Sequence, residues 1–74
     1  MQVSFDKVAN ALYLQFSHEK VKDSEEVTEG IIIDYGENES IIGIEILNYT
    51  ERKINLNEII KMNVDEIIPV IIQW

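Results

Sequence analysis

The sequence of 74 residues contains no cysteine and a single histidine. Without cysteine no disulfide can form, and no group of Cys and His ligands exists to hold a structural zinc ion. His18 alone cannot supply a two-histidine metal site. Its neighbours Ser17 and Glu19 invite a triad interpretation, but consecutive residues of an extended segment point to alternate sides. We therefore expect neither a metal nor a cofactor.

Glycine and basic residues are also scarce. The three glycines are scattered and no Gly-Lys-Ser/Thr motif occurs, which excludes a phosphate-binding loop. Six Lys and Arg against fourteen Asp and Glu give a net charge of −8. Because phosphate backbones and anionic lipids are bound through Lys and Arg, we expect no nucleic-acid or membrane partner. The charge suits a basic protein partner, although solubility alone would also explain it.

Long apolar runs are missing. Charged residues or proline interrupt every apolar stretch well before the roughly 20 residues that a membrane span needs. The first ten residues show no basic region followed by an apolar one, so no signal peptide is expected. The expectation is a cytoplasmic protein.

Isoleucine is abundant, and much of it falls between Ile31 and Leu47. Two isoleucine-rich runs flank a polar turn at 36–40, a pattern typical of a β-hairpin. Pairing Ile33 with Ile44 collects the isoleucines on one face and sets Asp34 beside Gly43. A slip of one residue would bury the charge of Asp34 among isoleucines, so the first register is predicted.

Three segments before the hairpin are predicted to be extended. Val3 and Phe5 alternate with polar neighbours, and residues 11–16 alternate with their leucines on one face. Residues 24–29 are acidic and suit an edge strand, where glutamates discourage unwanted pairing.

The last third has helical periodicity. Apolar residues recur with spacings of three and four, and the pairs Asn55/Glu58 and Asn63/Glu66 have the spacing of capping boxes. Residues 55–68 therefore form one helix or two helices broken near Met62.

Pro69 is expected to end any helix at or before Ile68. The tail 70–74 then becomes a short strand or an apolar peg, docked on its own sheet or on a neighbouring chain. Together the segments predict a single α+β domain over 1–74. Residues 1–50 form a small antiparallel sheet of four to five strands, and 51–74 form one C-terminal helix, packed on a face of the sheet, and a short tail.

Several residue groups resemble the small YuzE-like family of prokaryotic proteins, a domain of unknown function numbered 2283. They cover about the first 50 residues: Phe5-Asp6, Asn10 to Leu14, Ser24 to Val27, Ile33-Asp34-Tyr35 and Ile42 to Leu47. Asn10 replaces an acid that is usual there, and the hairpin turn lacks the common Asp-x-x-Gly form. The resemblance implies a compact antiparallel sheet without established activity. Some relatives look like partners of small toxin-like ribonuclease-fold proteins, which implies an antitoxin-like or accessory role.

Asp34 is the best single candidate for a role beyond solvation, because it interrupts an apolar strand. Asp34 and Glu45 share a face of the hairpin, and two close carboxylates could raise one pKa for acid–base chemistry. A solvated face is the simpler interpretation. A hydrogen bond from the turn to Asp34 would be structural. Gly43 suggests a close approach or a bulge within its strand.

Tyr13 and Tyr35 are expected to pack with exposed hydroxyls. Trp74, at the end of an apolar run, is the most interface-like side chain. The leading hypothesis is a non-enzymatic interaction module that forms a homo-oligomer or binds a basic protein. The alternatives are an oligomeric enzyme using Asp34 and Glu45, and a purely structural homodimer.

Overall fold

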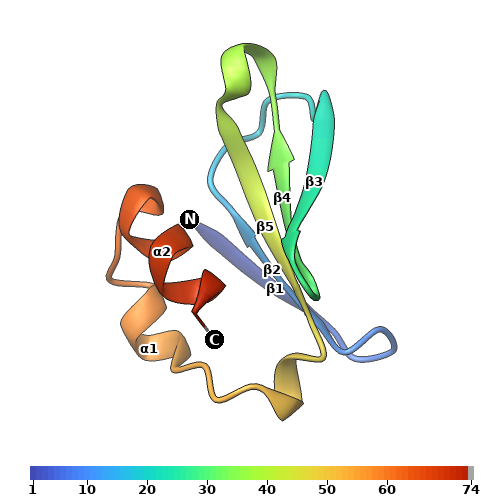
Figure 1. Cartoon of the computed structure of the whole chain (residues 1–74), viewed down its shortest axis with the longest axis vertical. Helices are drawn as coiled ribbons and strands as arrows, with labels where there is room; N and C mark the ends of the chain where they lie inside the picture. Colours follow the sequence, from blue (N-terminus) through green and yellow to red (C-terminus); the bar gives the residue numbers. More distant parts are fainter. Residues whose placement is uncertain (74) are drawn as a thin grey trace.

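The computed structural model describes residues 1–73 and consists of an antiparallel sheet followed by two helices (Figure 1). The strands are β1 (Gln2–Asp6), β2 (Ala11–Gln15), β3 (Asp23–Thr28), β4 (Ile31–Tyr35) and β5 (Ile41–Leu47). The helices are α1 (Leu56–Ile59) and α2 (Val64–Ile72), and short 3-10 turns span Glu37–Glu39 and Tyr49–Glu51. The strand order β1-β2-β5-β4-β3 leaves the sheet open, with β5 central and β1 and β3 at the edges. The predicted α+β fold is confirmed.

The register of the β4–β5 hairpin is the predicted one. Ile33 lies opposite Ile44, and Asp34 lies opposite Gly43. The pairing shifts after Asp34, so that Tyr35 lies opposite Ile41. The bulge changes the alternation at the start of β5, because Ile41 and not Ile42 lies beside Tyr35, and both Tyr35 and Ile41 pack against the core.

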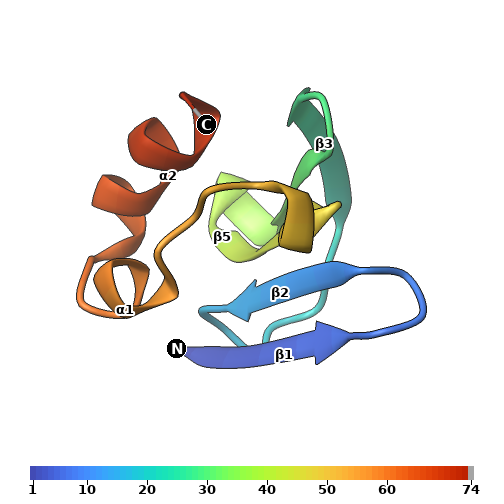
Figure 2. The ribbon, with the colours of Figure 1, turned by 90° about the horizontal axis from the view of Figure 1, so that it is seen from below.

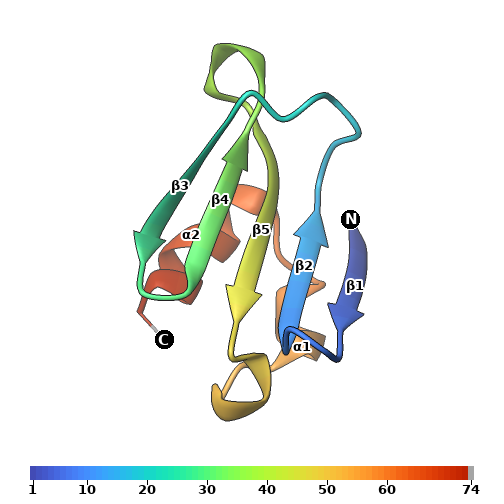
Figure 3. The ribbon, with the colours of Figure 1, turned by 90° about the vertical axis from the view of Figure 1, so that its right-hand side faces the viewer.

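One face of the sheet carries the core, and both helices cover that face (Figures 2 and 3). Alternation along each strand turns every second residue to this side, and these residues include most of the large apolar side chains, which meet the helix residues there. The fully buried cluster is Leu12, Leu14, Ile31, Ile33, Ile44, Ile46, Ile59, Ile67 and Ile71. For every strand residue in this list, the alternation of residues along the sequence had predicted that its side chain lies on this shared face. No helix among residues 1–73 has the length and apolar character needed to cross a membrane.

The expectation of one C-terminal helix is wrong, and the two-helix alternative is correct. Asn55 caps α1 through its side chain, which accepts a hydrogen bond from the Asn57 N–H at 3.0 Å. At the start of α2 the Glu66 side chain accepts from the Asn63 N–H at 3.1 Å. Two separate caps define two helix starts, because each satisfies N–H groups that have no partner within its own helix.

Pro69 does not end the helix, contrary to prediction. It lies inside α2, which continues to Ile72. The missing N–H leaves only the carbonyl of Asp65 without its helical donor, and Asp65 is exposed, so water can bind that carbonyl. Burial of Ile67 and Ile71 on both sides of the proline offsets the cost.

The tail is likewise helical where it was expected to be a strand or a peg. Val70 to Ile72 complete α2, and Ile71 is buried against the sheet of its own chain. Trp74, which was expected to anchor an interface, lies outside the described residues.

Candidate functional site

Figure 3 shows the sheet from the face away from the helices, which we call the open face. The strand register places a polar group of side chains on this face. Residues that lie opposite each other in the register share a face, and two rows cross the sheet here. One row is Tyr13, Glu45, Ile32 and Glu26, and the next is Gln15, Gly43, Asp34 and Ser24. Four predicted site residues, Tyr13, Asp34, Gly43 and Glu45, are therefore brought together.

The side chain of Tyr13 extends over Gly43, from the first row to the second. Its hydroxyl donates a hydrogen bond to Asp34 Oδ2 at 2.8 Å. A Cβ on Gly43 would overlap the Tyr13 ring and its hydroxyl, and would lie 2.9 Å from the carbonyl oxygen of Leu14. The glycine is therefore required by a close approach, as its position within a strand suggested.

Asp34 joins three strands, and its predicted role was wrong in detail. The expected hydrogen bond to the turn is replaced by bonds across the sheet, because the Ser24 hydroxyl of β3 donates to Oδ1 at 2.6 Å while Tyr13 of β2 donates to Oδ2. Both carboxylate oxygens thus accept from other strands, Oδ1 from the adjacent β3 and Oδ2 from β2, which lies beyond β5. This arrangement satisfies a charge in the middle of an apolar strand and fixes the positions of β2 and β3 relative to β4.

The Tyr13 hydroxyl is perturbed by this environment. Burial, the hydrogen bond to Asp34, and the charges of Asp34 and Glu45 raise the pKa of Tyr13 to about 12. In the unfolded chain tyrosine has a pKa of about 10. The stabilisation from Tyr13 is therefore complete below pH 10 and is lost between about pH 10 and pH 12, where only the unfolded chain has already released the proton.

We predict that an ultraviolet titration shows one tyrosine ionising near pH 12. Tyr13→Phe should remove this phase, and Asp34→Asn should lower its midpoint because the acceptor charge is gone. Tyr49→Phe is the control, since Tyr49 lies outside both rows of the open face. A phase near pH 12 that persists in Tyr13→Phe would contradict the assignment.

Within the described part of the single chain, Asp34 and Glu45 do not line a pocket. Both are partly exposed, and neither lines the pocket at Tyr35 or the smaller one beside Val21. Both oxygens of Asp34 are also engaged within the sheet. A carboxylate-based enzyme stays an untested prediction without support from this geometry.

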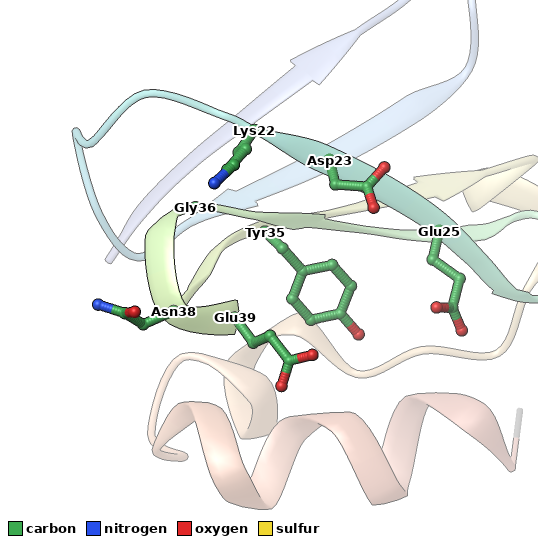
Figure 4. A pocket seen from close by; sticks show the side chains of 7 residues that line it. All are labelled: Lys22, Asp23, Glu25, Tyr35, Gly36, Asn38 and Glu39. Atoms are coloured by element: carbon green, nitrogen blue, oxygen red, sulfur yellow. The ribbon is translucent and has the colours of Figure 1, made fainter.

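Tyr35 lies on the opposite, helix-facing side and belongs to a different site. It packs partly against the core, and around it lies a pocket of about 580 Å³ (Figure 4). We call this the Tyr35 pocket. Its lining residues come from the start of β3, the end of β4 and the turn between β4 and β5: Lys22, Asp23, Glu25, Tyr35, Gly36, Asn38 and Glu39.

The Tyr35 pocket is negatively charged. Figure 4 shows the carboxylates of Glu25 and Glu39 beside the Tyr35 ring, with Lys22 directed away from them. The Lys22 ammonium lies 3.5 Å from Glu37, a pair exposed to solvent. Burial and the charges of Glu25 and Glu39 raise the pKa of Tyr35 above its usual value, so both carboxylates act on its hydroxyl.

Glu39 is held in an unfavourable backbone conformation. Its φ is 60°, in the left-handed region, and Asn38 before it has φ 58°. Asparagine tolerates this region, whereas glutamate pays about 1 kcal/mol or more relative to glycine. The turn thus keeps a carboxylate at the rim of the pocket where glycine would be more stable.

Sequence reasoning missed Ser24 and most of the Tyr35 pocket. Ser24 could have been found by pairing the predicted acidic edge strand with β4, since it lies directly opposite Asp34. The pocket had no comparable signal. It depends on the bulge after Asp34 and on the conformation of the turn, neither of which alternation predicts.

Comparison with known proteins identifies the family of this chain. Residues 2–49 match the model of a family described as a protein of unknown function, DUF2283. The match spans all five strands and ends before α1. It therefore includes both the Tyr35 pocket and the open-face group, which is Tyr13, Asp34, Gly43 and Glu45 on the face away from the helices. Searches of curated proteins and of solved structures returned no match. The chain belongs to the DUF2283 family of proteins of unknown function.

Proposed function

We propose that this protein is a non-enzymatic interaction module that binds a basic protein through the Tyr35 pocket. The observation that carries the proposal is an aromatic ring flanked by carboxylates in a pocket of about 580 Å³. Its volume lies within the range of about 300–1,000 Å³ that is usual for binding sites.

An arginine side chain of the partner fits the chemistry of this pocket. Its planar guanidinium can stack on the face of Tyr35. Its N–H groups can donate charge-assisted hydrogen bonds to Glu25 and Glu39, whose charges already act at the ring. The net charge of −8 would attract such a partner at longer range.

The conformation of Glu39 supports a binding role for the turn. Strained backbone is retained where the surrounding structure holds it, often at ligand contacts. At φ 60° glycine would relieve the strain but remove the carboxylate from the pocket. Under the proposal, binding benefits from the side chain at the expense of stability.

The test is calorimetric titration with an acetylated and amidated triarginine peptide. The wild-type protein should bind it, and Glu25→Gln/Glu39→Gln should weaken binding about tenfold or more, since each charge-assisted hydrogen bond contributes about 1.5–3 kcal/mol. Glu39→Gly should also weaken binding while raising thermal stability. Lost affinity in that variant cannot be explained by unfolding.

The matched control is Glu29→Gln/Glu58→Gln, which removes two exposed carboxylates outside the pocket. This control should retain nearly full affinity at moderate salt, where long-range attraction is screened. Equal losses in the two double variants would show that the peptide responds to net charge alone, and would overturn the proposal.

Two further sequence predictions belong with this proposal. A cytoplasmic location would be tested by fractionating the host cell. A partner resembling the toxin-like ribonuclease-fold proteins suggested by the family resemblance would have to be basic and to present an arginine to the Tyr35 pocket.

A further inference from the structure

The two edges of the sheet differ sharply in charge. The β3 edge carries Asp23, Glu25 and Glu26, and like charges on an edge strand oppose pairing with another chain. At the other edge, residues 1–5 include no charged side chain. Of the two edges, only β1 lacks this protection.

The backbone groups on the outer side of β1 can be assigned from the register. The Phe16 N–H donates to the Ile42 carbonyl at 2.8 Å, so even-numbered residues of β2 bond toward β5 and odd-numbered ones toward β1. Ser4 lies opposite an odd-numbered residue and therefore bonds to β2. Val3 and Phe5 consequently direct their N–H and C=O groups outward. Within residues 1–73, no strand lies beyond them.

The side chains at this edge are apolar and incompletely covered. Val3 and Phe5 lie on the helix-facing side, opposite Leu14 and Leu12. They are nevertheless 39% and 45% exposed. Phe5 is held in place by an edge-on contact with Tyr49, with ring centroids 5.8 Å apart.

We infer that β1 pairs in antiparallel fashion with β1 of a second copy of this chain, about a two-fold axis at Ser4. In this register Ser4 faces Ser4, and Val3 of each copy faces Phe5 of the other. The outward groups of Val3 and Phe5 then form a hydrogen-bonded pair on each side of the axis. The four apolar side chains meet on one face, where cross-strand apolar pairs add stability.

Charge identifies the second copy as the occupant. The register places Gln2 opposite Asp6, so no like-charged side chains face each other along the strand. A two-fold axis at β1 also puts the acidic β3 edges at opposite ends of the joined sheet, which minimises repulsion between two chains of charge −8. The strand is complementary to itself, as a two-fold interface requires. The Tyr35 pocket, at the β3 and β4 end, stays free.

The absence of cysteine allows a direct test by cross-linking. Ser4→Cys places a single thiol at the axis, where opposing Cα atoms of a non-hydrogen-bonded pair lie about 4.5 Å apart, within disulfide range. Gln2→Cys is the control, since its two copies would be offset by four residues, or about 13 Å. Under mild oxidation Ser4→Cys should form a covalent dimer far faster than Gln2→Cys.

Light scattering of the full chain supplies the second measurement. The wild type should show twice the monomer mass, and Val3→Lys should shift it to monomer. Val8→Lys, which adds the same charge at a turn residue that is 99% exposed, should remain dimeric. A monomeric wild type at submillimolar concentration, or a dimer in which Ser4→Cys cross-links no faster than Gln2→Cys, would overturn the inference. Either of these results would leave the outcome of the triarginine titration unaffected.

Discussion

Gly43→Ala should lower the free energy of unfolding by about 2–4 kcal/mol, combining overpacking with the loss of a hydrogen bond. The new methyl group would occupy the space of the Tyr13 ring and approach the Leu14 carbonyl oxygen at 2.9 Å. Tyr13 would have to rotate away and release Asp34. A domain of this size has a total stability of only about 4–11 kcal/mol, so the midpoint of urea unfolding should fall markedly.

Gly36→Ala is the matched control for this substitution. Gly36 is also buried, but an added Cβ there would meet mainly the flexible ends of Ile42 and Ser40. Its cost should be clearly smaller. In addition, Tyr13→Ala/Gly43→Ala should cost less than the sum of the two single variants, because the ring that obstructs the methyl group is gone. Equal losses for the two glycines, or strict additivity, would contradict the close approach as the cause.

Ile67→Ala should cost about 2–5 kcal/mol, as expected for truncating a fully buried isoleucine. Ile67 is completely inaccessible and belongs to the cluster that joins α2 to the sheet. It lies outside the residues that match the family. A large effect on urea unfolding would therefore show that the C-terminal helices are part of the same cooperative unit as the five strands.

Ile72→Ala in the same helix is its control. Ile72 is 43% exposed, so its truncation should cost well under 1 kcal/mol. If Ile67→Ala were as mild as Ile72→Ala, α2 would not contribute its packing energy to the folded sheet. If unfolding of the Ile67 variant occurred in two transitions, the helices would form a separate unit.

The strand register was predictable because burial of only one face of the sheet constrains it strongly. Strands with a single buried face alternate with period two, so a slip of one residue in the β4–β5 hairpin would exchange Asp34 with isoleucine in the core. The pairing of Ile33 with Ile44 followed directly from that constraint. Edge position was likewise predictable for β3, whose acidic side chains suit water.

The C-terminal region was harder because local rules conflict there. Pro69 predicts an end to the helix, whereas the apolar spacing from Ile67 to Ile71 predicts its continuation. Packing of both isoleucines on the sheet decides the outcome, and packing energy cannot be weighed from a local pattern. The two caps at Asn55 and Asn63 were the better guide, since each marks a helix start by its own hydrogen bond.

The two candidate sites also differ in how far the sequence predicts them. The open-face group follows from register, because Tyr13, Asp34, Gly43 and Glu45 lie in neighbouring rows of the sheet. The Tyr35 pocket arises from a bulge and from left-handed turn residues, which shape the surface without leaving a periodic signal. The surface on which the proposed function depends was therefore the less predictable of the two.

The most direct test of the proposed function is an amide chemical-shift map of the isotope-labelled wild-type protein during titration with acetyl-arginine amide. We expect the largest changes on the residues that line the Tyr35 pocket: Lys22, Asp23, Glu25, Tyr35, Gly36, Asn38 and Glu39. Largest changes around Glu45 on the open face, or changes of similar size at all acidic residues, would contradict the proposed function.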